Sequence, residues 1–383
     1  MEIGARLAFV RITDLRTPQV LIDRLRLESN IARMQAAATA RKIRLRPHSK
    51  THKSPVVAWM QIRQGAAGIC CAKLGEAEVF ADSGIGDIRL PYPVHPSNAD
   101  RVLVLMDRAR ISIIVDHPVV ARGWSDAMSR AGRTLDVLAK VDVGFHRCGI
   151  DPDAPDAIAF LRDVAALPGL RFRGLLSHAG HGYHADSEDE LRRTAKTEAA
   201  IHARLAAAAR AAGIPIEEIS VGATPTARFS LDEPGLTEMR PGNYVYLDRA
   251  QVALNVATLD DCAMSVMATV VSKPAAGRII LDCGSKTLSS DAARGFSKPE
   301  GYGAVFADLE AGAPDGSLLV ERLSEEHATV RVTSGSTRLQ PGDRVRVLPN
   351  HACAVSNLMD QVYLVDGPQV VDTLEVAARG KIW

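Results

Sequence analysis

Lys50 is the first residue whose surroundings could give it a chemical role. It lies in the segment RPHSKTHK (residues 46–53), directly after an apolar-alternating run. A side chain at the end of a strand lies at the rim of a sheet, where α/β enzymes hold their catalytic groups. Positive charge from Arg46, Lys53 and two histidines would destabilise the Lys50 ammonium and favour the neutral amine that forms a Schiff base. An exposed basic loop without a function is the alternative interpretation.

Two turns rich in small and hydroxyl residues are candidates for binding phosphate. The first, SVGATPT (residues 220–226), follows a strand-like segment and contains one glycine and three hydroxyls. Backbone N–H groups in such a turn can approach an anion closely, and the hydroxyls add donors. The second is PGNY (residues 241–244). Barrels commonly bind phosphate in the loops after the seventh and eighth strands, although an ordinary turn between strand and helix has the same composition.

A possible metal site lies near the end of the chain, at His351-Ala352-Cys353. In an extended chain the side chains of residues i and i+2 point to the same face. Imidazole nitrogen and thiolate sulfur both bind zinc, and two protein ligands leave positions open for water or a substrate oxygen. The alternative is a buried cysteine beside an ordinary histidine.

Three histidines at a spacing of three follow another strand, in SHAGHGYH (residues 177–184). They have one carboxylate and no thiol nearby, which argues against a second metal site, and the glycines between them allow close approach of a flat ligand. We therefore place Tyr183 and one or both of His178 and His181 around a cofactor ring. Arg147 follows a further strand and could pair with an anionic oxygen, or it is a surface arginine.

The elements that position these residues alternate between short apolar strands and amphipathic helices. Such alternation predicts parallel βα units, and eight units in about 230 residues match one closed (β/α)8 barrel, here residues 15–250. A dinucleotide-binding sheet is disfavoured because no GxGxxG follows the first strand. The predicted strands are residues 20–23, 43–50, 68–72, 87–91, 111–116, 135–143, 172–178 and 218–221.

From about residue 255 the alanine-rich helices give way to β-branched alternation punctuated by glycine and proline. This pattern predicts a separate antiparallel β domain, residues 255–383 together with residues 1–14, which carries the His351 and Cys353 pair.

Charge and hydropathy narrow the class of partner. The 383 residues hold 46 basic and 45 acidic side chains, a net charge of +1 that offers no field for nucleic acid. No stretch approaches about 18 apolar residues, and residues 7–10 are too short for a signal-peptide core. Six cysteines show no CxxC spacing, so no disulfide framework is indicated. We expect a soluble cytoplasmic protein, without a nucleic-acid or membrane partner, that acts on a small molecule.

Taken together, these segments resemble the metal-activated pyridoxal-phosphate enzymes of fold type III, the group of eukaryotic-type D-serine dehydratase and D-threonine aldolase with an alanine-racemase-like barrel. The resemblance covers nearly the whole chain. The matching segments, in order, are residues 46–53, 178–183, 220–226, 246–252, 301–303 with 307–310, and 351–353.

The resemblance implies roles for individual residues. Lys50 would form the internal aldimine with pyridoxal 5'-phosphate, and His178 and His181 would be further catalytic groups. His351 and Cys353 would bind a divalent metal, zinc first, with manganese or magnesium as alternatives. The remaining cofactor contacts would be Gly222, Thr224, Gly242 and Asn243 at the phosphate, Arg147 near the phenolic oxygen and Tyr183 near the pyridine nitrogen. The family also implies a homodimer.

The resemblance implies a lyase acting on a D-3-hydroxy amino acid: D-serine, D-threonine or D-3-hydroxyaspartate. The His-x-Cys pair and the loop HAGHGY resemble the dehydratases, which release a 2-oxo acid and ammonia, whereas the aldolases tend to carry His-x-Asp and give glycine and an aldehyde. Aldol cleavage stays open as the alternative. A racemase, with Tyr302 as the second acid or base, and a non-catalytic cofactor carrier are disfavoured, because neither explains a β domain with a metal pair.

Overall fold

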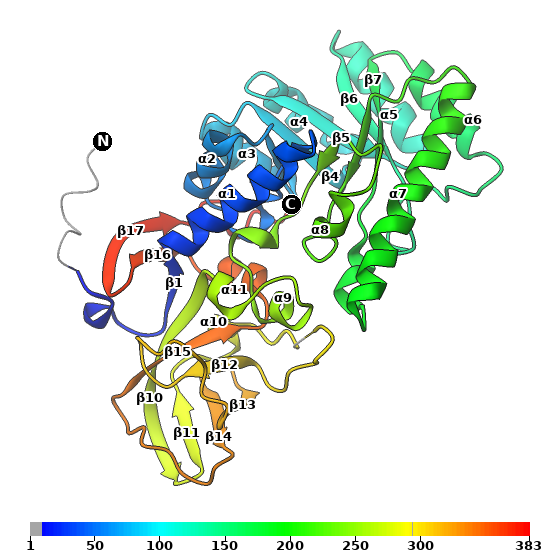
Figure 1. The fold of residues 1–383 in the computed structure, drawn as a ribbon. Helices are drawn as coiled ribbons and strands as arrows, with labels where there is room; N and C mark the ends of the chain where they lie inside the picture. Colours follow the sequence, from blue (N-terminus) through cyan, green and yellow to red (C-terminus); the bar gives the residue numbers. More distant parts are fainter. Residues whose placement is uncertain (1–9, 293) are drawn as a thin grey trace. The chain divides into compact units, whose positions relative to one another are not determined.

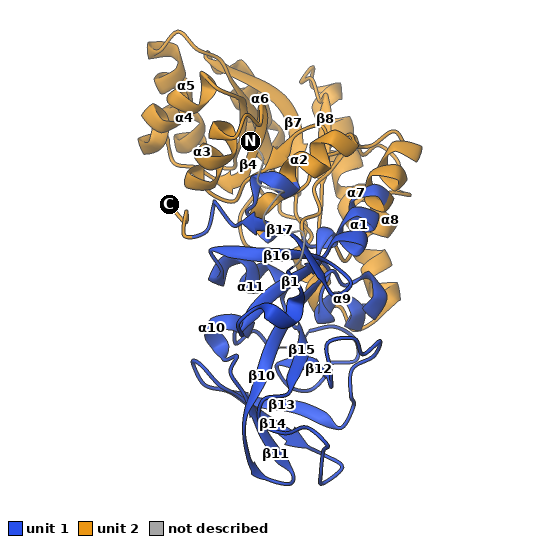
Figure 2. Ribbon diagram, turned by 90° about the vertical axis from the view of Figure 1, so that its left-hand side faces the viewer, with its two compact units in different colours: residues 1–32, 51–57, 243–379 blue, residues 33–50, 58–242, 380–383 orange. Residues whose placement is uncertain are grey.

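The computed structural model describes residues 10–292 and 294–383 (Figure 1). The chain divides into two compact units, coloured separately in Figure 2. The barrel unit comprises residues 33–50, 58–242 and 380–383, and the β unit comprises residues 51–57, 243–379 and the described part of 1–32. The chain thus passes between the units several times, whereas the sequence predicted one barrel segment from residue 15 to 250. Residues 1–9 of the segment predicted to join the β domain lie outside the described residues.

The barrel unit is built on an eight-stranded parallel sheet, as expected. A parallel bridge between His48 and Cys70 joins the two ends of the strand order, so the sheet closes into a ring. Side chains at the carboxyl ends of all eight strands therefore share one rim. The order around the sheet is β2 (Arg44–Leu45), β9 (Glu238–Met239), β8 (Glu218–Val221), β7 (Leu170–Leu176), β6 (Leu135–Lys140), β5 (Arg110–Val115), β4 (Asp87–Pro93) and β3 (Ile69–Cys70).

Helices follow most of these strands. The longest, α7 (Glu188–Ala211), begins at Ser187, whose hydroxyl accepts the Glu190 N–H. Three acidic residues in its first turn interact favourably with the positive end of the helix dipole and so stabilise the helix. Its buried side chains recur at helical spacing. The others are α2 (Pro55–Gln64), α3 (Leu74–Asp82), α4 (Ala99–Met106), α5 (Pro118–Arg130), α6 (Ala157–Ala166) and α8 (Ala227–Ser230), while α1 (Arg24–Ala40) precedes the first barrel strand.

One predicted barrel strand is wrong. Residues 20–23 lie in β1 (Gln19–Asp23), which pairs antiparallel with β10 (Met264–Ala275) and parallel with β16 (Gln361–Asp366) of the β unit. The eighth barrel strand is instead β9, whose two residues are too few to show a strand period. A short apolar run before a helix has the same local pattern in either sheet, and only distant partners decide which sheet it joins.

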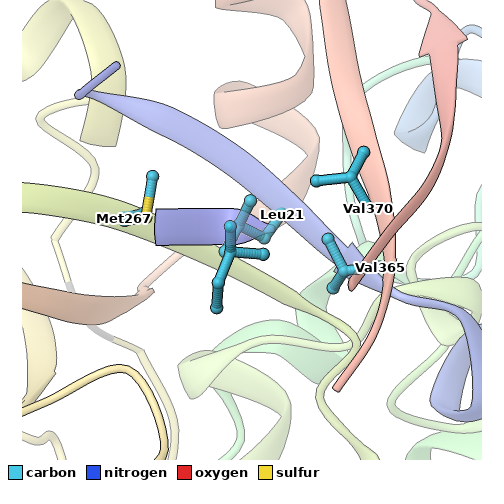
Figure 3. Close-up of a cluster of buried hydrophobic side chains, with 5 residues drawn as sticks. Leu21, Met267, Val365 and Val370 are labelled. Carbon is cyan, nitrogen blue, oxygen red and sulfur yellow. The ribbon is translucent and has the colours of Figure 1, made fainter. Parts of the chain in front are cut away.

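The β unit holds a nine-stranded, mostly antiparallel sheet, as predicted for the C-terminal region. Its core includes a cluster of Ile12, Leu21, Met267, Val365 and Val370, in which strands from both ends of the chain pack together (Figure 3). The strand order is β11 (Arg278–Leu281), β14 (Ala328–Val332), β13 (Leu318–Leu323), β12 (Gly303–Phe306), β15 (Arg344–Pro349), β10, β1, β16 and β17 (Gln369–Glu375), with helices α9 (Arg249–Ala253), α10 (Ser285–Leu288) and α11 (Ala352–Leu358) between strands.

Throughout residues 10–292 and 294–383, no helix combines the length and the apolar character needed to cross a lipid bilayer.

Candidate active site

Lys50 lies just beyond β2 of the barrel unit. The strand expected over residues 43–50 is shorter than predicted, and Lys50 belongs to a 3₁₀ helix, Ser49–Thr51. Its side chain is exposed, and its backbone N–H donates to His48 Nδ1 at 3.3 Å. The lysine is therefore at the end of a barrel strand, as expected, but on a helical turn that follows it.

Our expectation that the charge of Arg46 would destabilise the Lys50 ammonium is wrong. The buried Arg46 guanidinium donates to Glu238 at 2.9 Å and to Asp87 at 2.6 Å, so carboxylates neutralise its charge. Arg89 pairs with the same Glu238 from β4. Burial would raise the pKa of Glu238, but Arg89 and Arg46 outweigh burial and lower it to about 2. The barrel interior is thus crossed by a layer of paired charges that holds its short strands together.

His178 is the residue around which the barrel's candidate groups gather. Its Nδ1 lies 2.6 Å from the carbonyl oxygen of Gly222. A carbonyl only accepts, so Nδ1 carries the hydrogen and Nε2 keeps its lone pair. Desolvation, and then the nearby charge of Lys50, lower the pKa of His178 well below its ordinary value. His178 is therefore a neutral imidazole near the Lys50 ammonium.

Phe145 connects three of the predicted site residues, and the sequence analysis did not single it out. The centre of its ring lies 5.9 Å from that of the His178 ring, in an edge-on arrangement, and 6.4 Å from that of the His181 ring. The Arg147 guanidinium lies over the Phe145 ring, 5.0 Å from its centre. Gly180 is required here because a Cβ at that position would lie 2.6 Å from the Phe145 ring. Desolvation lowers the pKa of His181. The glycine of this loop thus makes room for an aromatic side chain of the protein itself.

Lys140 is a second residue that the sequence analysis missed. It ends the fully buried strand β6, and desolvation, followed by the charge of Arg240, lowers its pKa to about 7. Buried Glu198 lies close enough to interact with it and accepts the Ser177 hydroxyl at 2.5 Å. The available signal was a lysine that ends a strand directly after three apolar residues, because a lysine is rarely buried without a partner.

The predicted phosphate turn presents one polar group without a protein partner. Thr224 is buried, and its Oγ1 has no hydrogen-bond partner within the described part of the chain. A buried hydroxyl of this kind needs an acceptor or donor from a ligand or water, which fits a phosphate. Gly222 has no room for a side chain, because a Cβ there would lie 2.7 Å from the backbone nitrogen of Arg240. Gly242 is also buried, and Tyr183 lies half-buried in the loop after β7.

His351 and Cys353 come together in the β unit, but not in the extended geometry that we expected. His351 caps helix α11, and Cys353 lies in its first turn. The two side chains are hydrogen-bonded to each other, so they are near enough to share one cation. The hydroxyl of Thr51, which follows Lys50 in the chain, lies 3.2 Å from the Cys353 sulfur. Lys53, expected beside Lys50, instead donates to Asn357 at 2.6 Å.

Buried Asp248 holds this turn in place. One carboxylate oxygen accepts the backbone N–H of Ala352 at 2.9 Å and the Asn243 amide at 2.6 Å. The other oxygen accepts the Gln251 N–H at the start of α9. The Asn243 amide also lies 3.7 Å from the Cys353 sulfur. The side-chain amide of Asn243, a residue predicted to contact the phosphate, is therefore part of the frame around the thiol.

The donors of the β unit fit a divalent cation. Burial would lower the pKa of His351, but Cys353, Asp248 and Asp291 outweigh burial and raise it to about 10, so the surroundings attract positive charge. Within the described residues, no group of three or more His, Cys, Asp and Glu side chains is placed to hold a metal. His351 and Cys353 would supply two donors, and the other positions of the ion would be open to water or substrate.

Comparisons with known proteins agree with both units. An alanine racemase N-terminal domain family matches residues 22–250, and a putative serine dehydratase domain matches residues 263–365. D-threonine aldolase from an Arthrobacter species is 34% identical over 95% of this chain and 93% of its own length. This chain belongs to the alanine-racemase-like pyridoxal-phosphate lyases. D-threo-3-hydroxyaspartate dehydratase from Delftia sp. strain HT23 is 36% identical over 89% of this lyase and 91% of its own length.

Solved structures extend the likeness to the fold of this lyase. The Delftia dehydratase superposes with a TM-score of 0.90 at 34% identity, over 97% of this chain and 100% of that one. D-threonine aldolase from Filomicrobium marinum gives 0.88 at 31% identity, over 99% and 100%. Alanine racemase from Clostridium difficile 630 gives 0.70 at 13% identity, over 94% and 99%, which shows the shared fold alone.

Proposed function

We propose that this lyase removes water from a D-3-hydroxy amino acid and releases a 2-oxo acid and ammonia. The observation that carries the proposal is the pairing of an imidazole with a thiol, His351 with Cys353, in an anionic setting held by Asp248. Such a pair can bind a divalent ion with positions left open for a substrate hydroxyl. Zinc suits a thiolate donor best, whereas manganese and magnesium prefer oxygen.

The barrel residues supply the proton chemistry and the cofactor contacts in this proposal. When bound, pyridoxal 5'-phosphate withdraws electrons from the substrate Cα and makes its proton acidic. Lys50 would hold the cofactor, and its Nζ would accept the Cα proton. His178 presents a neutral Nε2 that can accept a hydrogen bond, because Gly222 holds its other nitrogen protonated. The other proposed contacts are Thr224, Gly222, Gly242 and Asn243 at the phosphate, with Arg147, Tyr183 and His181 around the ring.

The cysteine favours dehydration over aldol cleavage. A cysteine-to-alanine variant of D-threo-3-hydroxyaspartate dehydratase has been solved in the metal-free form, at a TM-score of 0.91 to this chain. The D-threo-3-hydroxyaspartate dehydratase from Delftia acts on the compound in its name, so this compound is the first substrate to test, followed by D-serine and D-threonine. Aldol cleavage remains the second candidate because aldolases are also among the relatives. A homodimer and a cytoplasmic location stay predictions.

Product analysis separates the two reactions. The enzyme, loaded with pyridoxal 5'-phosphate and zinc, is incubated with each of the three substrates, and ammonia and glycine are measured separately. We expect ammonia without glycine, and loss of activity by at least about a hundredfold on chelation or in Cys353→Ala, because the leaving hydroxyl then departs without a Lewis acid. Cys283→Ala, which removes a buried thiol of the same unit, is the matched control and should keep the activity. Glycine as the product would establish the aldolase instead, and full activity in Cys353→Ala would refute the metal assignment.

A further inference from the structure

Asp291 lies beside the proposed metal ligand His351, sixty residues away in the sequence. Its Oδ2 is 2.5 Å from the His351 Nδ1. A carboxylate at neutral pH only accepts, so Nδ1 must carry the hydrogen of this contact. Nε2 is then the nitrogen left to face a cation. The contact therefore selects one of the two ring nitrogens as the donor.

The backbone of Asp291 is held in place by the residue next to His351. The Asn350 amide donates to the backbone oxygen of Asp291 at 3.1 Å and to that of Gly301 at 3.0 Å. Arg249 donates to the Asn350 side-chain oxygen at 3.2 Å. Asn350 is buried, so this link ties the loop that carries Asp291 to the end of strand β15. The position of Asp291 follows from this link rather than from its pairing with the imidazole alone.

The other nearby carboxylate, Asp248, is bonded to different groups. Both oxygens of Asp248 are occupied by the backbone N–H groups of Ala352 and Gln251 and by the Asn243 amide. Asp248 thus holds the backbone of the turn, whereas the hydrogen bond from the imidazole goes to Asp291. The two carboxylates have separate structural tasks.

We infer that Asp291 is a positioning residue for metal binding: it fixes the tautomer and ring orientation of His351 so that Nε2 faces the divalent ion. This inference rests on the proposed function, which makes His351 a ligand. Carboxylates that accept the second N–H of a metal-bound histidine increase the basicity of the ligand, and their loss weakens metal binding by about 10- to 100-fold.

The solvent exposure of Asp291 and His351 indicates that their pairing positions the imidazole and contributes little to the stability of the fold. The His351 side chain is 35% exposed and that of Asp291 is 40% exposed. An ion pair this open to water contributes little to stability. Replacement of Asp291 should therefore change the affinity for metal while the thermal unfolding temperature of the metal-free protein stays the same.

Cobalt titration of metal-free protein tests the inference without an activity assay. Co²⁺ bound to a thiolate absorbs in the near ultraviolet, which reports the Cys353 ligand directly. We expect Asp291→Asn to bind Co²⁺ about 10- to 100-fold more weakly, yet to reach the wild-type band at saturation, with Asp291→Glu recovering part of the affinity. Asp372→Asn, a half-buried carboxylate of the same unit that accepts the Thr373 N–H, is the matched control and should bind as the wild type does.

The results of these titrations distinguish a failure of the Asp291 inference from a failure of the proposed metal site. Wild-type affinity in Asp291→Asn, with the band still lost in Cys353→Ala, would overturn the inference and leave the metal site standing. Absence of a thiolate band in the wild type, or an unchanged band in both Cys353→Ala and His351→Ala, would overturn the metal site and the inference together.

Discussion

His178 illustrates how neighbours set the chemistry of a residue. Its type and position in the loop after a strand made it a candidate, but its neutral state follows from desolvation and from the Lys50 charge. The Gly222 carbonyl decides which ring nitrogen carries the hydrogen. Lys140 shows the same effect at a residue that the sequence analysis passed over, because burial, followed by the charge of Arg240, lowers the pKa of its ammonium from an ordinary 10.5 to about 7.

Replacement of Lys50 tests the central assignment at this scale. In Lys50→Ala we expect the visible absorption band of lysine-bound cofactor to be absent and turnover to fall by at least about 10²- to 10⁴-fold, because the cofactor anchor and the proton acceptor are both removed. Lys196→Ala removes an exposed lysine on α7 and serves as the control. Retention of the band in Lys50→Ala would contradict the assignment.

Strand β9 is the element on which the barrel interior depends. It has only two residues, yet Glu238 on it accepts hydrogen bonds from Arg46, Arg89 and Ser220, which come from three different parts of the sheet. Removing one partner from a buried ionic group leaves the other charges unpaired in a region of low polarity, which costs about 3–5 kcal/mol.

The acid sensitivity of the fold follows from this element. The pKa of Glu238 is about 2 in the folded chain against an ordinary 4.5, so its ionised form stabilises the fold above pH 4.5. That stability is lost as the pH falls from 4.5 towards 2. We expect Glu238→Gln to lower the free energy of unfolding by about 3–5 kcal/mol at pH 7, and the difference from wild type to shrink below pH 4.5, as measured by urea unfolding.

An exposed pair provides the comparison for that experiment. Glu321 and Arg331 form a salt bridge across neighbouring strands of the β unit, with side chains 38% and 50% exposed. Glu321→Gln should change the free energy of unfolding by less than about 1 kcal/mol at any pH. A Glu238→Gln effect equally small at pH 7 would show that the buried charge layer does not stabilise the barrel.

At the scale of the whole molecule, the proposed ligands divide between the two units. Lys50, His178 and Thr224 belong to the barrel unit, and His351 and Cys353 to the β unit. The β unit also takes its first strand from the start of the chain, since β1 lies between β10 and β16. Bound metal should therefore stabilise the β unit directly, independently of any ligand bound by the barrel unit.

Hydrogen exchange with and without a chelator tests this division. A ligand at about 100 times its dissociation constant adds about 2.7 kcal/mol to the free energy of unfolding of the part of the protein that binds it. We expect chelation to reduce amide protection in β15 and α11, and no such change in Cys353→Ala, which should lack the metal from the outset. Loss of protection confined to the barrel strands would place the metal elsewhere.

The sequence by itself determined most of the elements and the candidate chemistry. Hydrophobic period and glycine-rich turns are local properties, so they predicted a parallel barrel followed by an antiparallel β domain, and they placed Lys50 and the segment of residues 220–226 after barrel strands. The resemblance carried by six short segments predicted the family, and the comparisons confirmed it.

Only the tertiary structure decided what depends on contacts between distant residues. The pairing of β1 with β10 and β16, the neutralisation of Arg46 by Glu238 and the contact of Asp291 with His351 join residues up to several hundred positions apart. No local pattern encodes such pairings, because each residue alone satisfies many partners equally well. Burial and charge compensation in the folded chain select one partner, and this selection sets the chemistry of the proposed site.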